Sequence, residues 1–354
     1  MTEPTPITPS LIALLEKLSN ACAVSGDEGQ VRQIVLDEIR PCADSIQVDA
    51  LGNVLAVRKA KVENPLRVLV DAHMDEVGFM IVDDEKDGIY RFDLIGGIDL
   101  RVLPGKIVRV GKDNLPGVIG ARPIHLTDAS EREHKIPLDT LRIDMGQNGG
   151  KVQPGDRATF GTRFRQQGPS LVGKALDDRI GVATLIELVK NPPETVELLA
   201  SFSVQEEIGG RGARVAAHRF NPDLAIALDS TPAYDLPVWD DSENTAYNCR
   251  LGAGPAIYIA DSATLSDPRL VRHLAQTAEA AGIPFQFRQP GGGGTDAGAI
   301  HRTRAGVPSV SISVPGRYAH TAVMISRLAD WEATLALLHA ALAGLDRSVL
   351  SAER

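Results

Sequence analysis

The chain has 354 residues, of which 43% are hydrophobic and 23% are charged, and its formal net charge is -9. This composition is that of a folded globular protein with room for roughly two domains. The lysines and arginines are scattered and form no basic stripe, which argues against a nucleic-acid or an anionic-membrane partner.

The cysteines and the first residues indicate a protein of the cytoplasm. Cys22, Cys42 and Cys249 are too few and too widely spaced for a disulfide framework or a zinc knuckle, so we expect them to stay reduced. The start of the chain lacks the basic segment and the unbroken apolar core of a secretion signal. No apolar run approaches the ~20 residues that span a bilayer. We therefore expect a cytoplasmic location and no membrane partner.

The first third of the chain changes from a mixed to a β-rich pattern. The runs 10–22 and 27–40 have the apolar spacing of helices, and each begins with a Ser or Asp that can cap the first turn. Residues 66–73, LRVLVDAH, form an almost continuous apolar run that predicts a strand covered on both faces. Residues 78–169 then show short β-type runs separated by glycine and proline, which predicts a compact β-rich segment.

Helix and strand patterns alternate again in the rest of the chain. The expected helices are 177–191, 213–220, 266–282, 295–303 and 327–345, and the expected strands are 196–204, 223–229, 285–288 and 307–315. Such alternation predicts an α/β fold in which helices flank a mixed sheet, interrupted by a separate β module. We therefore divide the chain into a discontinuous α/β domain, 1–77 and 170–354, and an inserted β-rich domain, 78–169.

Polar residues gather where the apolar strands end, and open α/β sheets build their sites at the carboxyl ends of strands. They are His73, Asp75, Asp177, Glu206, Glu207, Asp229 and His320. His, Asp and Glu side chains together suit a divalent transition metal. Two such cations facing Asp177, Glu207 and Asp229 leave about one positive charge for a bound hydroxide, which favours hydrolysis. Glu206, next to a ligand in an extended chain, should point another way and suits a general base.

Each of these residues also has an ordinary structural explanation when it is taken singly. Asp75 could satisfy His73, Asp177 could cap its helix, and Asp229 could start a turn. The occurrence of all of them beside buried strands favours a site. The run GGGGTDAG (291–298) lacks the lysine of a phosphate-binding loop and instead predicts a glycine-rich turn into a capped helix. The chain has no GxSxG elbow, so covalent acyl-enzyme chemistry has little support.

Long motifs spread over the chain resemble one known family, the tetrahedral-shell (TET) metallo-aminopeptidases, which include glutamyl aminopeptidases and proteins once labelled cellulase M. The motifs are SGDE, DALGNVLA, DAHMDEVGFMI, GGIDLRVLPGKIV, GVIGARPIH, VQPGD, KALDDR, QEEIGGRGA, LGAGP, GGGGTDAGAIH and YAHT. The resemblance runs almost from end to end. It implies a zinc-peptidase-like fold whose inserted β-barrel-like domain mediates dimerisation, with dimers closing into a tetrahedral dodecamer that admits only peptides.

The resemblance also implies a role for each candidate residue. The implied metal ligands are His73, Asp177, Glu207, Asp229 and His320. Asp75 would orient His73, Asp177 would bridge two divalent ions, and Glu206 would be the general base. Zinc or cobalt is expected, with manganese as a further choice. One departure concerns Met324, which stands where relatives commonly carry an acid after the last histidine.

We therefore expect a metallo-aminopeptidase that hydrolyses the N-terminal residue from short peptides through a hydroxide held by two metals, with Glu206 as base. Two alternatives remain open: a deacylase or amidohydrolase with the same dinuclear site, and a catalytically silent binding protein. A glycosidase is disfavoured because it needs two opposed carboxylates and no metal, whereas the acids here come with histidines.

Overall fold

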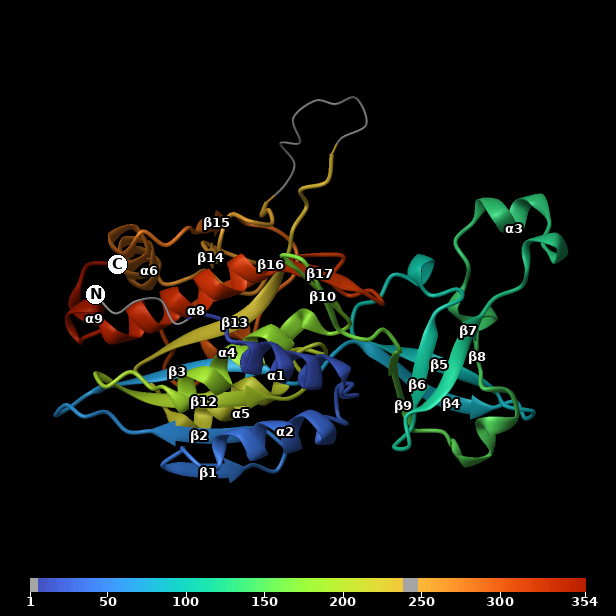
Figure 1. Ribbon diagram of the computed structural model, residues 1–354, viewed down its shortest axis with the longest axis horizontal. Coiled ribbons are helices and arrows are strands. Elements are labelled where there is room, and N and C mark those ends of the chain that lie inside the picture. Colours follow the sequence, from blue (N-terminus) through green and yellow to red (C-terminus); the bar gives the residue numbers. More distant parts are fainter. Residues whose placement is uncertain (1–5, 238–247) are drawn as a thin grey trace.

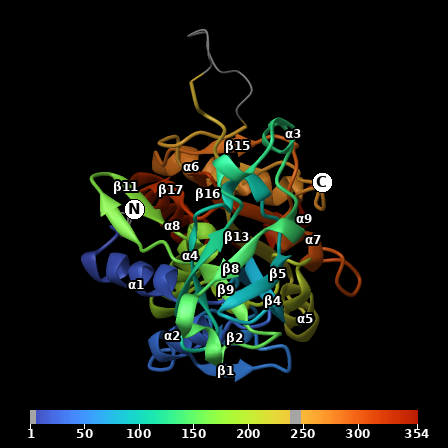
Figure 2. The ribbon, with the colours of Figure 1, turned by 90° about the vertical axis from the view of Figure 1, so that its right-hand side faces the viewer.

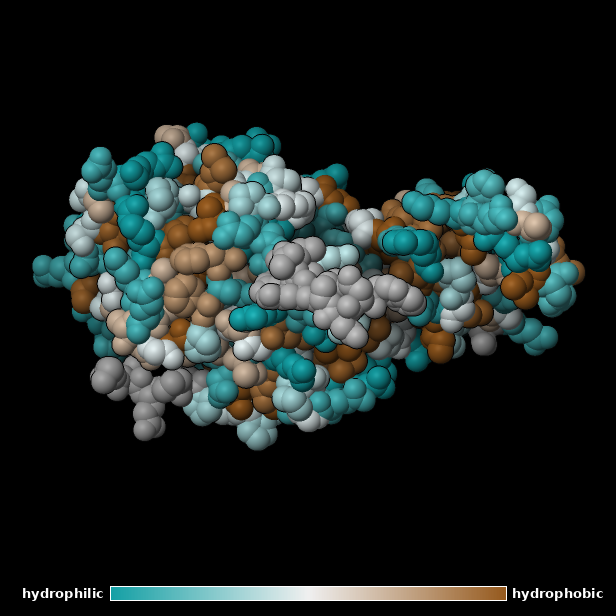
Figure 3. All heavy atoms as spheres, turned by 90° about the horizontal axis from the view of Figure 1, so that it is seen from above, coloured by the Kyte–Doolittle hydropathy of each residue, from teal (hydrophilic) through white to brown (hydrophobic). Residues whose placement is uncertain are grey.

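The protein consists of two parts of unequal size in the computed structural model, which describes residues 6–237 and 248–354 (Figure 1). The larger part is a mixed sheet flanked by helices, and the smaller part is a closed β-barrel that projects from one end of it. Figure 2 looks from the barrel toward the sheet, and the space-filling view in Figure 3 shows a narrower waist between the two lobes. Within the described residues, no helix combines the length and the apolar character needed to cross a membrane.

The elements of each part are as follows. The helices of the larger part are α1 (Pro9–Asn20), α2 (Gly29–Ile39), α4 (Leu176–Lys190), α5 (Arg211–Phe220), α6 (Pro268–Ala281), α7 (Ala297–Ile300), α8 (Leu328–Ala343) and α9 (Ser348–Ser351). Its strands are β1 (Ser45–Val48), β2 (Val54–Arg58), β3 (Leu66–His73), β10 (Arg165–Gln167), β11 (Ser170–Gly173), β12 (Val196–Ser203), β13 (Leu224–Pro232), β14 (Ala256–Tyr258), β15 (Gln286–Arg288), β16 (Ser309–Arg317) and β17 (Met324–Arg327). The barrel strands are β4 (Gly78–Asp84), β5 (Ile89–Ile95), β6 (Ile107–Val110), β7 (Leu115–Gly120), β8 (Arg142–Asp144) and β9 (Arg157–Phe160), with helix α3 (Ala129–Glu133) after β7.

The central strands of the large sheet bring distant segments to one edge. The strand order is β1-β2-β12-β3-β13-β16-β17-β11-β10, and the four central strands β12, β3, β13 and β16 run parallel to one another. Ser203 pairs with His73, so β12 and β3 end level with each other. Because parallel strands share one direction, the residues after β12, β3 and β16 and those at the end of β13 meet at the same edge.

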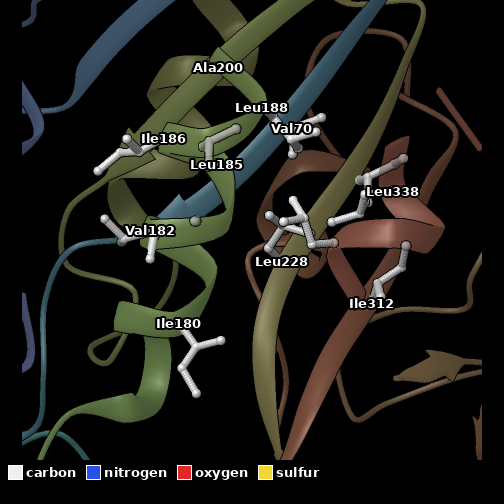
Figure 4. Close-up of a cluster of buried hydrophobic side chains, with 14 of the residues drawn as sticks. Val70, Ile180, Val182, Leu185, Ile186, Leu188, Ala200, Leu228, Ile312 and Leu338 are labelled. Atoms are coloured by element: carbon white, nitrogen blue, oxygen red, sulfur yellow. The ribbon is translucent and has the colours of Figure 1, made fainter. Parts of the chain in front are cut away.

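Both faces of the sheet are covered, as the apolar run of β3 predicts. Val68 and Val70 belong to the core cluster under α1, α2, α4, α6 and α8, whereas Leu69 belongs to the cluster under α5 and α7. Figure 4 shows α4 side chains, among them Val182 and Leu185, beside the strands of the first cluster. Successive strand residues point to opposite faces, so a strand buried on both sides must be apolar throughout.

Two helix starts differ from the sequence prediction. Helix α1 is capped by Thr8, whose side chain accepts a hydrogen bond from the Leu11 N–H, rather than by Ser10. Pro9 explains the shift, because proline lacks an N–H and suits the first turn. Helix α2 follows Glu28 and has no side-chain cap, so Asp27 does not cap it. The expected helix 295–303 is reduced to the single turn of α7.

The barrel has its own hydrophobic core. Phe79 packs edge-to-face against Phe92 and Phe160, with ring centroids 5.2 Å apart in each pair. Closure in the order β4-β5-β8-β7-β6-β9 leaves no open sheet edge in the barrel. Strand β10 falls within the range 78–169 that the sequence assigns to the insertion, but it pairs with β11 in the large sheet.

Candidate metal centre

The five residues that the sequence analysis expects as metal ligands lie together at the edge of the large sheet, in two clusters that share Asp177. In the first cluster, His73 Nε2 lies 3.3 Å from Asp177 Oδ1 and 3.8 Å from Asp229 Oδ1. In the second, His320 Nε2 lies 3.5 Å from Asp177 Oδ2 and 3.4 Å from Glu207 Oε2. Within each cluster the candidate ligand atoms all lie within 4.8 Å of one another, so each cluster could hold one cation.

Local backbone geometry brings Asp177 to the strands. Helix α4 begins at Leu176, but Asp177 and Asp178 do not have helical backbone angles, and the peptide bond between them is cis. The Asp178 side chain, and not that of Asp177, accepts a hydrogen bond from a helix N–H, that of Gly181. Asp177 is therefore not a regular first-turn residue, and its two carboxylate oxygens face the two histidines.

The adjacent pair Glu206 and Glu207 lies in a turn, not in the extended chain that the sequence predicts after strand 196–204. Gln205 adopts a left-handed backbone with φ 60°, so the extended conformation of β12 does not continue into Glu206 and Glu207. The N–H groups of Glu206 and Glu207 then donate to the two oxygens of Asp75, at 3.0 and 3.2 Å. As a result both glutamates line the same cavity, although only Glu207 belongs to a cluster.

Asp75 lies at the centre of this arrangement. It is fully buried, its Oδ1 is 3.5 Å from His73 Nδ1, and its Oδ2 accepts a hydrogen bond from Ser25 at 2.6 Å. Burial alone would raise the pKa of Asp75, but the neighbouring His73 and Ser25 outweigh it and lower the pKa. An ionised Asp75 can thus hold the His73 ring and the glutamate turn at once.

The other carboxylates of the site are buried close together, and their mutual repulsion is the kind that a bound cation would relieve. Burial and the like charge of Asp177 raise the pKa of Glu207 to about 8 and that of Asp229 to about 6, against the opposing effect of the histidines. Burial also raises the pKa of Glu206. Burial lowers the pKa of His320, but its bond to Asp177 and the charge of Glu207 dominate and raise it to about 10. In the metal-free site, bound protons therefore offset the negative charge that a cation would otherwise neutralise. The His and carboxylate donors are those of zinc, cobalt or manganese sites.

The clusters open onto a cavity of about 530 Å³ that also has a basic wall. Arg288, Arg302 and Tyr258 line it with the glycine-rich segment 292–294. The Arg288 guanidinium lies 4.5 Å from the centroid of the Tyr258 ring. The sequence predicts the glycine-rich turn but gives no sign of either arginine, because FQFR and AIHRT carry no signal beyond secondary structure.

A buried ionic network beneath the clusters also escapes the sequence analysis. Lys174 Nζ donates to both carboxylate oxygens of Glu76, at 2.6 and 2.8 Å, and Arg179 Nη2 lies 3.2 Å from the same group. Burial lowers the pKa of Lys174 in spite of Glu76. Glu76 follows Asp75, and Lys174 and Arg179 flank Asp177 in the sequence. The network therefore fastens the start of α4 to the end of β3.

Comparison with known proteins assigns the chain to a family. The family description M42 glutamyl aminopeptidase matches residues 52–337. The chain belongs to this family. The glutamyl aminopeptidase of Lactococcus lactis subsp. cremoris is 33% identical over 94% of this chain and 96% of its own. The lysyl aminopeptidase of Pyrococcus furiosus is 32% identical over 93% of this chain and 96% of its own.

Solved structures agree with the observed architecture. The TET1 peptidase of Pyrococcus horikoshii is 34% identical, superposes with a TM-score of 0.82, and covers 95% of this chain and 100% of its own. The resemblance noted in the sequence is thus confirmed, as is the α/β fold with its separate barrel. Membership of the family makes the protein a peptide hydrolase with aminopeptidase activity.

Proposed function

We propose that the protein is a dinuclear metal-dependent aminopeptidase that removes the N-terminal residue from short peptides. The observation that carries the proposal is the shared carboxylate of Asp177, whose two oxygens face His73 at 3.3 Å and His320 at 3.5 Å. Each cluster offers three protein ligands, which leaves positions for water and for the substrate amine. Zinc or cobalt suits this donor set, with manganese as the alternative.

The placement of the side chains supports a role for each of them. Two divalent cations in these clusters would supply a water nucleophile at neutral pH and polarise the first peptide carbonyl. Glu206 lines the cavity and belongs to neither cluster, so its carboxylate can accept the proton of the attacking water and pass it to the leaving amine. Asp75 contacts the His73 ring and the Glu206 N–H, and in this way holds a ligand and the base in one geometry.

The basic wall of the cavity supports a preference for an acidic first residue. Arg288 is only 5% exposed, and its guanidinium donates hydrogen bonds to neutral oxygens of Thr231, Ala260 and Gly292. Among the described residues, no carboxylate forms an ion pair with Arg288 or Arg302, which both line the cavity. A guanidinium in such a setting attracts the carboxylate of a substrate side chain. We expect kcat/KM to fall in the order glutamyl, glutaminyl, lysyl anilide. Glutamine is the matched uncharged control for glutamate.

Metal removal and replacement test the proposed function. The protein is stripped with a chelator, and zinc, cobalt or manganese is added back singly before assay on amino-acid anilides and their N-acylated counterparts. We expect no turnover without metal, recovery with at least one ion, and hydrolysis of the free-amine substrates only. Equal hydrolysis of the acylated set would support the deacylase alternative. Two bound ions without any turnover would support the silent binding protein.

We further propose that the chain forms a cytoplasmic homo-oligomer in which the inserted domain, 78–169, mediates dimerisation and dimers close into a tetrahedral dodecamer. The similar TET1 peptidase can assemble into a tetrahedron or a large octahedral shell. Ile107, Ile124 and Leu126 of the insertion are exposed, which suits a contact surface. The three free cysteines suit a reducing compartment. Native mass spectrometry should find twelve chain masses, and a monomer at assay concentration would contradict the assembly.

A further inference from the structure

His320 is the exposed member of the candidate metal centre. Its side chain is 41% exposed, whereas that of His73 is 2% exposed. It lies in a turn after β16 and has a left-handed backbone with φ 57°. His320 is not part of a strand, whereas His73 ends β3, which pairs with both β12 and β13. Something else must keep its ring directed at the acids.

The contact that holds the ring comes from the barrel. Within the described residues, His320 Nδ1 has one hydrogen-bond partner, the backbone carbonyl oxygen of Gly97, at 2.8 Å. A carbonyl can only accept, so Nδ1 must carry the proton. This leaves Nε2, which faces Asp177 and Glu207, as the nitrogen that can bind a cation.

Packing around this contact is tight. A Cβ added to Gly96, whose φ is +80°, would lie 2.7 Å from Val77 Cγ1 and 3.4 Å from Glu207 Cβ. Gly97 precedes Ile98, which is buried in the barrel core. The Gly96–Gly97 turn therefore lies against two of the three members of the second cluster, His320 and Glu207.

The loop that carries His320 is also anchored in both parts of the molecule. Ala322 is buried in the hydrophobic cluster of the barrel together with Ile98. Met324, two residues later, is buried in the core of the large sheet. The histidine therefore sits where the chain crosses from one core to the other, and its position depends on how the barrel meets the sheet.

We propose that the Gly96–Gly97 turn of the barrel is a positioning element of the metal centre, which completes the cluster of Asp177, Glu207 and His320 by fixing the ring of His320. The inference rests on the two-cation site of the proposed function. It gives the insertion a role in ion binding within each chain, distinct from any role in assembly. The first cluster, with His73 and Asp229, should not depend on the turn.

A matched pair of glycine variants tests the proposal. Gly96→Ala and Gly105→Ala introduce the same side chain at nearly the same backbone angle, φ +80° and +78°, in the same barrel. Only the first Cβ has close neighbours, since nothing lies within 4 Å of a Cβ at Gly105. Stripped proteins are titrated with zinc, and the bound ions are counted by calorimetry and elemental analysis.

We expect the wild type and Gly105→Ala to bind two ions and Gly96→Ala to bind one ion normally and the second ~10- to 100-fold more weakly, the range for loss of a contact that orients a ligand. A merely structural defect would weaken both ions alike. Two ions bound with unchanged affinity by Gly96→Ala would overturn the inference. A wild type that binds no zinc, cobalt or manganese would instead overturn the proposed function.

A double-mutant cycle shows whether the turn acts through the histidine. If it does, Gly96→Ala should change the residual affinity of the second cluster by less than about twofold in the His320→Ala background, against ~10- to 100-fold in the wild-type background, because coupled residues are not additive. Should Gly96→Ala fail to fold, Ile98→Ala loosens the turn from within the barrel core, with Ile143→Ala as the control in β8 of the same core. Equal loss of the second ion in both isoleucine variants would also contradict the proposal.

Discussion

The two candidate metal clusters share Asp177 but are built in different ways. His73 lies at the end of a strand that pairs on both sides, and its neighbours Asp75 and Asp229 belong to or follow parallel strands. His320 lies on a turn, has a side chain that is partly exposed, and has its ring hydrogen-bonded to a carbonyl in another part of the molecule. The cluster with His73 is thus built by the strands of the large sheet, whereas the cluster with His320 lies where the sheet and the barrel meet.

Glu206→Gln tests catalysis without changing a metal ligand of either cluster. Of the variants considered, it should have the largest effect on the peptidase rate. The amide cannot accept the proton of the attacking water, so kcat should fall by about 10²- to 10⁴-fold. Both ions should stay bound, because Glu206 belongs to neither cluster. Steady-state kinetics and elemental analysis on the same sample check this. Retention of most of the peptidase rate would rule out Glu206 as the base.

His73→Ala and His320→Ala compare the clusters directly. Each should lose one ion, but removing buried His73 also leaves Asp75 and Asp229 without the positive charge beside them, which costs about 3–5 kcal/mol for a buried charge pair. His320 is exposed, so its loss should leave the metal-free protein nearly as stable. Urea unfolding of the stripped variants measures the difference. Equal losses of stability would show that the two clusters are equally integrated into the fold.

The stabilisation that metal gives should grow with pH. The raised pKa values of Glu207, about 8, and His320, about 10, mean that the metal-free folded state holds protons that the unfolded chain releases earlier. Its stability therefore falls as pH rises from about 6 toward 9. Cations displace these protons and remove the loss. Melting temperatures with and without chelator should diverge over this range, and a constant gap would contradict the assignment of these groups to the ion site.

Met324 should behave as a core residue despite the acid that relatives commonly carry. It is 3% exposed and packs in the core of the large sheet. Met324→Leu should cost less than about 1.5 kcal/mol. Met324→Glu should cost more, because it buries a charge close to Asp177 and Glu207, with which Met324 lines a small cavity. Urea denaturation of both variants checks this, and a stabilising glutamate would reverse the interpretation.

Much of the fold and the convergence of the candidate ligands could be predicted from the sequence. An unbroken apolar run such as LRVLVDAH suits only a strand covered on both faces, and parallel strands force the polar residues at their ends together. His73, Asp229 and the pair at 206–207 are therefore placed by periodicity alone. Asp177 follows from its position at the head of a buried helix.

The rest depends on contacts between residues far apart in the chain or on single backbone angles. The link from Gly97 to His320 spans more than two hundred residues and uses a carbonyl, which every residue possesses. The turn at Glu206 depends on the left-handed angle of Gln205, a residue type that gives no such signal. Arg288 reaches the cavity because β15 pairs with β14, which in turn pairs with β16 of the large sheet.

Anomalous diffraction from zinc-soaked crystals shows whether Asp177 is shared by two cations. We expect two peaks per chain roughly 3.5–4 Å apart, the usual spacing of paired catalytic metals, with Asp177 between them, His73 on one and His320 on the other. A single peak, peaks away from Asp177, or none at saturating zinc would contradict the shared two-cation site.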